Sequence, residues 1–334
     1  MGKRFIREER FAHERMRLLE IPRGLGRALR AALGGHSPFE VLTAVVSIAV
    51  VALLGLIALI LLLAAGTSIG AFGFGFLGGG VWDPIGEVFG AAPFVYGTLI
   101  TAALALLLGV PISMGIAMFL SELAPRWLRV PLTYVVELLA AVPSVVYGLW
   151  GLKVLGPVMS SAIEPAIAGV LGFLPLFQGN PIGTDKFTAS VILAVMIIPT
   201  ISAVSREALL AVPQSQREAA LSLGATRWET TRVAVLRYAR AGIFGAIVLG
   251  LGRAVGETMA VTMTIGNRNS ISASLFDQGQ TIASLIASSF AEAKGLELSA
   301  MIELGLVLML ISLVINIFAR LMVGRFLRRG EGAA

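Results

Sequence analysis

The chain has 334 residues, of which 57% are hydrophobic and 14% are charged, and its mean hydropathy is +0.88. A soluble domain carries about 25% charged residues, so the composition excludes a soluble protein of this size and requires that most of the surface faces lipid. The formal net charge of +6 does not indicate nucleic-acid binding, because the basic residues lie between apolar blocks rather than on one continuous face.

Residues 1–39 form a basic segment that precedes the first apolar run. Arg and Glu alternate there with apolar residues, which is compatible with an amphipathic helix on the cytoplasmic membrane surface. A partly disordered basic tail fits the same pattern, and both interpretations stay open. The two histidines of the chain, His13 and His36, lie in this segment and lack the helical spacing of a metal site.

Six apolar runs are long enough to cross a hydrocarbon core of about 30 Å, which takes roughly 20 helical residues. They predict an all-α membrane protein of six transmembrane helices, with a transmembrane domain over residues 40–325 and a short cytoplasmic tail, 326–334. Prolines interrupt three of the runs, which is tolerated where neighbouring helices shelter the freed carbonyl groups. An apolar stretch at 167–177 is too short to cross and is expected at the interface. The runs lie near residues 41–65, 97–120, 130–155, 188–206, 241–265 and 299–322.

Loop charges predict the orientation of these helices. With six helices, 21 Lys and Arg residues fall on the side of the two termini and four fall on the opposite side. The positive-inside rule therefore places both termini in the cytoplasm. A helix count wrong by one would destroy this alternation, so the charge pattern supports six helices independently.

The longest connection on the basic side, residues 207–240, has the signals of two short helices joined at a glycine. Ser215 and Glu218 have the spacing of a capping box, and Gly224 is typical of a left-handed helix end. Thr226 and Glu229 repeat the capping-box spacing. We expect helices at 216–223 and from 227 onward, either as a plain surface hairpin or as a rigid knob to which a partner docks.

The fifth apolar run contains two opposite charges, Arg253 and Glu257, whose spacing places them on one face of a helix. An isolated Arg at bilayer depth costs about 2.5 to 17 kcal/mol, so intramembrane charges favour a functional role. Gly252 and Gly256 allow close helix approach, and Thr258 continues a polar stripe. The alternative is an ion pair that pins this helix to a neighbour.

The pair suits a protonated oxyanion. The planar guanidinium group of Arg253 offers paired donors that match phosphate oxygens. Phosphate at neutral pH keeps at least one proton, so the Glu257 carboxylate can accept a hydrogen bond from it. Sulfate has no proton to donate. Two other carboxylates, Glu137 and Glu303, are expected to face water near the membrane boundary.

The triplet Glu218-Ala219-Ala220, followed by Gly224 and Leu236, resembles the EAA loop of bacterial ABC importer permeases. The family usually has Ile where Ala234 stands and Pro where Arg237 stands. The resemblance implies that Glu218, Ala219, Ala220 and Gly224 couple the membrane helices to a cytoplasmic ATPase. The chain itself has no Gly-x-x-x-x-Gly-Lys-Ser/Thr loop for ATP.

Two further segments, residues 142–151 (VPSVVYGLWG) and 250–261 (GLGRAVGETMAV), look like signatures of the PstC-type permeases of phosphate-specific ABC importers. With the EAA loop, the resemblance covers roughly residues 95 to 325. It implies that phosphate passes Arg253, Glu257 and Thr258. It also implies a location in a bacterial or archaeal cytoplasmic membrane and no cofactor in this chain.

The same resemblance supplies the expected partners: a PstA-type sister permease, two PstB-type ATPase subunits that hold ATP and Mg²⁺, and an extracytoplasmic PstS-type phosphate-binding protein. Three alternatives stay open from the residues. An ABC permease could serve sulfate or molybdate, and a secondary transporter or channel would not need the 218–224 loop. An intramembrane enzyme is disfavoured, because the chain has no cysteine and no histidine within an apolar run.

Overall fold

A computed structural model describes residues 38–331, and the predicted N-terminal segment up to residue 37 lies outside the described residues. The chain divides into two units between Ile60 and Leu61. Helix α3 (Pro38–Ala64) begins in the first unit and is apolar on all sides, which is the composition of a lipid-facing helix.

The second unit is helical apart from one small hairpin, in which β1 (Trp82–Asp83) pairs antiparallel with β2 (Val88–Phe89). Four π-helical turns interrupt or extend its helices: η1 (Phe119–Leu123), η2 (Gly151–Leu155), η3 (Met159–Ile163) and η5 (Thr231–Val235). A 3-10 turn, η4, covers Pro175–Phe177. The α-helices are α4 (Gly66–Phe72), α5 (Gly75–Gly78), α6 (Ala92–Met118), α7 (Arg126–Ala141), α8 (Ser144–Trp150), α9 (Gly156–Val158), α10 (Glu164–Leu171), α11 (Lys186–Leu210), α12 (Gln214–Ser222), α13 (Arg227–Thr230), α14 (Leu236–Gly256), α15 (Met259–Thr264), α16 (Ile282–Ser289) and α17 (Gly295–Glu331).

Six helical stretches in the described part of the chain are long and apolar enough to cross a membrane, which confirms the predicted number. Five overlap the predicted runs closely or are extended at one end. The third does not, because it begins and ends about a dozen residues later than predicted. The stretches are Phe39–Ala64, Ala92–Leu123, Ser144–Leu171, Lys186–Leu210, Arg227–Gly256 and Gly295–Met322.

The predicted third helix, 130–155, is wrong as a continuous helix. α7 ends at Ala141, and Val142 has an extended backbone (φ −64°, ψ 128°). The cause is Pro143, whose ring disfavours a helical backbone in the residue before it. The third candidate span therefore starts at Ser144 and includes α10, so the apolar stretch at 167–177 begins inside a span rather than outside one.

The buried α11 lies at the centre of the second unit and packs against α6 and α14. Their shared core combines alanines with branched residues such as Leu193 and Ile197. Gly109 of α6 lies against the Ile197 side chain, and Gly250 of α14 lies against Ile201. Small residues at these crossings allow the close helix approach on which packing within a membrane depends.

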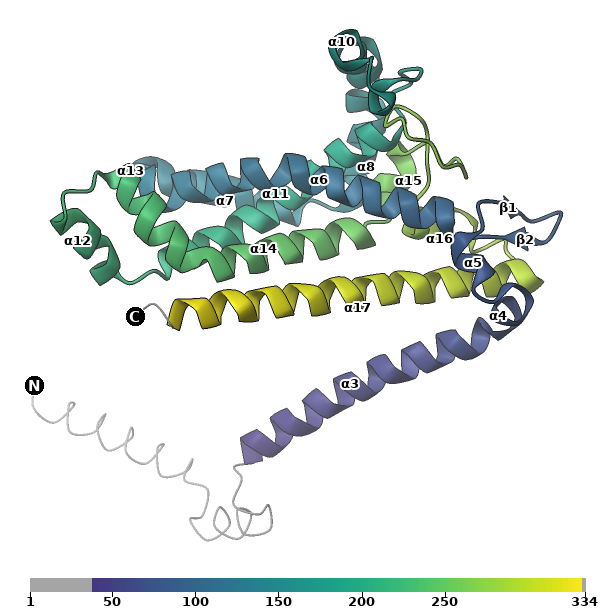
Figure 1. Cartoon of the computed structure of the whole chain (residues 1–334), viewed down its shortest axis with the longest axis horizontal. Helices are drawn as coiled ribbons and strands as arrows, with labels where there is room; N and C mark the ends of the chain where they lie inside the picture. The colour runs from purple at the N-terminus through teal and green to yellow at the C-terminus, as the bar shows by residue number, and fades with distance from the viewer. Residues whose placement is uncertain (1–37, 332–334) are drawn as a thin grey trace, which may run out of the picture. The chain divides into compact units, whose positions relative to one another are not determined.

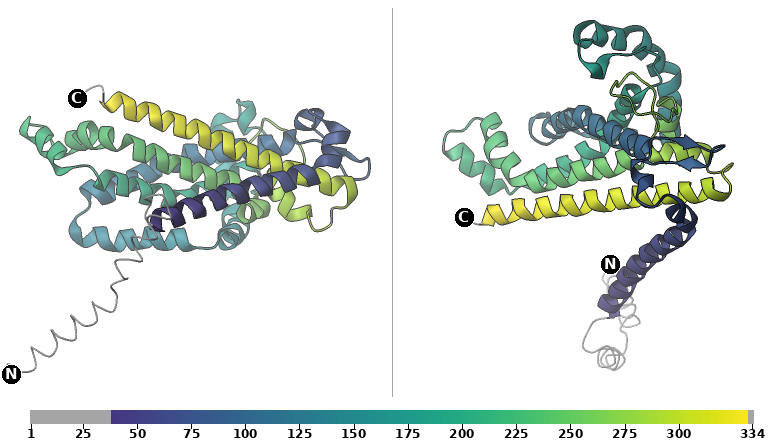
Figure 2. Two further views of the ribbon diagram at one scale, coloured as in Figure 1. Left: turned by 90° about the horizontal axis from the view of Figure 1, so that it is seen from below. Right: turned by 45° about the vertical axis from the view of Figure 1, so that its right-hand side comes forward.

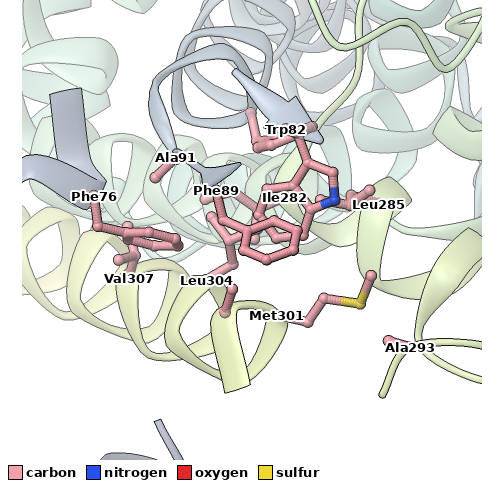
Figure 3. Packing of buried hydrophobic residues seen from close by; sticks show 12 residues of the cluster. Phe76, Trp82, Phe89, Ala91, Ile282, Leu285, Ala293, Met301, Leu304 and Val307 are labelled. Carbon is pink, nitrogen blue, oxygen red and sulfur yellow. The ribbon is translucent and has the colours of Figure 1, made fainter. Parts of the chain in front are cut away.

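A second core lies at one end of this unit, where α16 and the start of α17 meet the β-hairpin (Figure 3). The Trp82 ring contacts Phe89 and Phe94 edge-on, with ring centroids 4.8 and 5.2 Å apart. Leu304 and Met301 of α17 pack beneath these rings. This aromatic cluster explains why the short hairpin is ordered although it has only two residues in each strand.

The second unit thus has two different ends. α12 and α13 lie at the end where α17 finishes, and β1, β2, α4 and α5 lie at the opposite end (Figures 1 and 2). From α8 onward the chain leaves the α6–α11 bundle and leads to α10 (Figure 1). The predicted polar residues of the fifth run and the predicted docking loop therefore lie at different levels along the bundle.

Candidate functional site

The fifth apolar run is broken where its polar residues lie. α14 ends at Gly256, Glu257 has an extended backbone (φ −70°, ψ 127°), and α15 begins at Met259. The break lies part-way along α6 and α17 (Figure 1). The predicted continuous helix 241–265 is therefore wrong, and so is the placement of Arg253 and Glu257 one turn apart on one helical face.

Local chemistry accounts for the break. Gly256 has no side chain to stabilise a further helical turn. The Glu257 carboxylate accepts a hydrogen bond from the Ala260 amide at 3.4 Å, so it supports the start of α15. The Thr258 hydroxyl donates to the Gly256 carbonyl at 3.2 Å. Side chains thus replace part of the hydrogen bonding that an unbroken helix would supply.

Arg253 points to a neighbouring helix rather than to Glu257. Its Nη1 donates to the Thr200 hydroxyl of α11 at 3.1 Å. Among the described residues, the salt bridges within 4.0 Å do not include one between Arg253 and Glu257. Both side chains are half-buried, as is Thr258. Neither charge is neutralised by the other, so both remain available to a polar ligand.

The structure brings together the two segments that resemble a permease signature. α8, which carries residues 144–150, packs against α15. A Cβ atom added at Gly148 would lie 2.9 Å from the Ala260 Cα atom and 3.3 Å from the Met259 carbonyl oxygen. Arg253 also interacts electrostatically with Tyr147, whose hydroxyl donates to the Leu139 carbonyl at 2.8 Å. The contact requires glycine at 148.

The loop at 207–240 forms the two predicted short helices. Gly224 has a positive φ of 86°, which confirms the left-handed helix end. The Gly224 amide donates to Leu221 and the Ala225 amide to Ala220, which is the hydrogen-bond pattern of a Schellman motif. The following capping box is also confirmed, since Thr226 and Glu229 exchange hydrogen bonds between side chain and backbone.

The first capping box was predicted wrongly. α12 begins at Gln214 after Pro213, with no side-chain cap, so Ser215 lies within its first turn. Proline is favoured next to a helix start because it has no amide to leave unpaired. Glu218 and Ala219 are exposed on α12 and Ala220 is half-exposed. The coupling role of these residues and of Gly224 stays a prediction.

A salt bridge in this region was not predicted. Arg217 of α12 contacts Glu122 of η1 at 2.9 Å, although 95 positions separate them in the chain. The same guanidinium group donates to the carbonyl oxygens of Leu209, at 2.9 Å, and of Val212. Residue spacing carries no signal for such a long-range contact. The hint available was an Arg directly before the Glu-Ala-Ala triplet.

Two buried carboxyl groups were also missed. Glu164, at the start of α10, and Asp185, at the N-cap of α11, are fully buried and hydrogen bond to each other. Thr188 donates its hydroxyl to Glu164 at 3.1 Å and its amide to Asp185 at 2.8 Å. Burial, reinforced by the nearby Glu164, raises the pKa of Asp185 to about 8.

Glu303 does not face water as expected. It is buried in α17, and its carboxylate accepts a hydrogen bond from the Ser68 hydroxyl of α4 at 2.6 Å. A hydroxyl partner 235 positions away cannot be read from local polarity. Glu137, in contrast, is exposed on α7.

Known proteins agree with this architecture. The family model described as "Binding-protein-dependent transport system inner membrane component" matches residues 109–328. The phosphate transport system permease protein PstC of Haemophilus influenzae is 46% identical over 86% of this chain and 93% of its own length. The protein of the same name from Xylella fastidiosa is 44% identical over 92% of this chain and 95% of its own.

Among solved structures, the methionine ABC transporter MetNI in an inward-facing conformation is similar in fold. Its matching chain gives a TM-score of 0.52 at 17% identity and covers 74% of this chain and 99% of the other. The two broken helices, the exposed helical hairpin and the six membrane-length stretches thus occur in a chain with close relatives of one kind. The chain belongs to the binding-protein-dependent transport system inner membrane components, as a multi-pass member of the PstC permease family.

Proposed function

We propose that this chain is the permease subunit through which an ATP-driven importer moves inorganic phosphate across the cytoplasmic membrane, with both termini in the cytoplasm. The identity to PstC proteins supports the substrate. The excess of Lys and Arg on the side of the termini supports the orientation. α12 and α13 then lie at the cytoplasmic end of the second unit.

The observation that carries the proposal is the break at Gly256–Thr258. Irregular backbone at membrane depth is tolerated only where it is buried in protein or lines a water-filled cavity. Glu257 and Thr258 are half-exposed, so the second case applies. Phosphate passing the break meets the Arg253 guanidinium group as a donor and the Glu257 carboxylate as an acceptor for its remaining proton.

Energy enters through α12. We assign ATP and Mg²⁺ to two cytoplasmic PstB-type subunits, because the chain has no loop of its own for nucleotide phosphates. The exposed Glu218–Ala220 surface of α12 is the proposed docking site of one of them. A PstA-type sister permease and an extracytoplasmic PstS-type binding protein complete the proposed assembly.

The test is phosphate uptake by cells that keep the other subunits and carry Arg253→Gln, Glu257→Gln or both. We expect complexes that assemble normally but lose uptake by roughly 10-fold or more, because each change removes a charge-assisted hydrogen bond of about 1.5–3 kcal/mol. Unchanged uptake in the double variant would contradict the proposed pathway. Loss of assembly would instead support a packing role for Arg253 through Thr200.

The competing substrate is a fully deprotonated oxyanion. Sulfate in excess should leave phosphate uptake unchanged in the natural chain, because it cannot donate a proton to Glu257. The Glu257→Gln variant provides the contrast, since a neutral amide removes the repulsion between Glu257 and sulfate. Sulfate inhibition of the natural chain that equals inhibition by unlabelled phosphate would favour a general oxyanion permease.

A further inference from the structure

The guanidinium group of Arg217 joins three elements at the end of the second unit that carries α12. From α12 it contacts the Glu122 carboxylate in η1, which extends α6, and two carbonyl oxygens at the end of α11. The side chains of Arg217 and Glu122 are only 16% and 15% exposed. A pair shielded to this degree is screened less by salt than an exposed one.

The contact with α11 meets a general need of helix ends. The last carbonyl groups of a helix have no partner within the helix and carry a partial negative charge. Arg217 donates to the Leu209 carbonyl, in the last turn of α11, and to the Val212 carbonyl just beyond it. The planar fork of an Arg can reach several acceptors at once, which a Lys ammonium on its flexible stem does less well.

α12 has few other attachments to the membrane helices. None of its residues is buried, and its neighbours in the fold are α13 and η5. It is joined to α11 through the short connection Ala211–Pro213 and to α13 through the corner at Gly224. A force applied to α12 would turn it about these joints unless another contact held it to the ends of α6 and α11.

We propose that Arg217 is a positioning residue that fastens α12 to η1 and to the end of α11, so that the three move as one body when the ATPase closes. The inference rests on the proposed function of α12 as the docking helix. It assigns to this chain an internal clamp, distinct from the docking surface at Glu218–Ala220. The clamp converts a displacement of α12 into a displacement of α6 and α11 together.

The test uses the complete complex in liposomes with the binding protein, and it measures phosphate uptake and ATP hydrolysis in the same sample. Arg217→Gln should lower the phosphate moved per ATP by roughly 10-fold while hydrolysis continues, since hydrogen bonds to a charged group are lost. Arg217→Lys should give a smaller loss. Arg232→Gln is the matched control, because Arg232 is an exposed arginine of η5, and it should behave like the natural chain.

Glu122→Gln removes the ion-pair partner but leaves both carbonyl contacts, so we expect a smaller loss in the same direction. The double variant Arg217→Gln/Glu122→Gln should be no worse than Arg217→Gln alone, because the two residues act as one unit. Additive losses would contradict the clamp. Glu122→Gln also keeps the proposal testable if Arg217→Gln does not assemble.

A covalent replacement gives the sharpest readout. The chain has no cysteine, so Glu122→Cys/Arg217→Cys introduces the only two thiols in it. Two long side chains span this gap, and a direct disulfide needs β-carbons about 4 Å apart, so a short bifunctional methanethiosulfonate is the linker. With other subunits free of reactive cysteine, coupling should be low before linkage, recover after it and fall again with dithiothreitol.

Two results would overturn the clamp alone: an Arg217→Gln complex that couples like the natural one, or a linked complex that stays uncoupled. The second would mean that α12 must move relative to η1 during transport. A natural complex that hydrolyses ATP without moving phosphate would overturn the proposed function, and the clamp with it. Failure of the clamp and failure of the function are therefore distinguishable.

Discussion

Among single residues, Asp185 has the most unusual surroundings in the described part of the chain outside the candidate spans. It has no exposed surface, it caps α11 through the Thr188 amide, and it lies against the Glu164 carboxyl group. One oxygen atom of each carboxyl group has no other hydrogen-bond partner. A proton shared between the two groups satisfies both atoms and joins α10 to the start of α11.

This arrangement predicts stability that falls with rising pH. The pKa of Asp185 is raised to about 8 from its ordinary value of 3.8, so the folded chain holds a proton that the unfolded chain releases at lower pH. The stabilisation is fully present below about pH 4 and is lost as the pH rises through about 8. Asp185→Asn keeps the acceptor for Thr188 and should flatten this dependence between pH 5 and 8.

The measurement is the apparent melting temperature of the purified complex in detergent across that pH range. The charges that face the pair include Lys186, which interacts with both Asp185 and Asp277, and they are unchanged in the variant. Glu137→Gln, at an exposed carboxylate of α7, is the control and should keep the slope of the natural chain. Equal slopes for the natural chain and Asp185→Asn would refute the shared proton.

At the scale of elements, the Gly224 corner sets the angle between α12 and α13. Its φ of 86° is a left-handed conformation, and a Cβ atom added there would meet nothing within 4 Å. A substitution therefore acts on the backbone alone. Gly224→Ala should cost about 1–2 kcal/mol and weaken co-purification of the ATPase subunit. Gly224→Asn should be milder, because Asn tolerates this conformation. Equal weakening by both would argue against a backbone cause.

The elements that could be predicted from the sequence are those with local causes. Six apolar runs, the left-handed Gly224 and the capping box at Thr226 each depend on residues within one segment, and all three predictions were confirmed. The breaks at Val142 and Glu257 were missed for a different reason. A hydropathy pattern records apolar length, and it does not distinguish a continuous helix from two helices joined by one extended residue.

Long-range polar contacts could not be predicted at all. Arg217 with Glu122, Asp185 with Glu164 and Glu303 with Ser68 join residues that lie 95, 21 and 235 positions apart. No periodicity relates such positions, and each contact forms only because tertiary packing brings two helix ends together. The proposed pathway residues Arg253 and Glu257 were recognisable because charges within an apolar run stand out, although their geometry was wrong.

On the scale of the whole molecule, the proposed mechanism needs the two ends of the second unit on opposite sides of the membrane. α12 lies at one end and the β1–β2 hairpin at the other (Figure 1). If α12 receives a cytoplasmic ATPase, the aromatic core around Trp82 faces the extracytoplasmic side. The four outward Lys and Arg residues against 21 inward ones follow the same division.

Thiol labelling can test this orientation directly, because the natural chain has no cysteine and gives no background. Leu223, at the end of α12, is 89% exposed, and Ile85, between β1 and β2, is 97% exposed, so cysteine at either position leaves the packing intact. A membrane-impermeant maleimide should label Ile85→Cys in right-side-out vesicles and Leu223→Cys in inside-out vesicles. The opposite pattern would place α12 outside the cell, where no ATP-hydrolysing partner could reach it, and would refute the proposed coupling. Labelling of both positions from one side would refute six crossings, since the chain between Ile85 and Leu223 would then cross an even number of times.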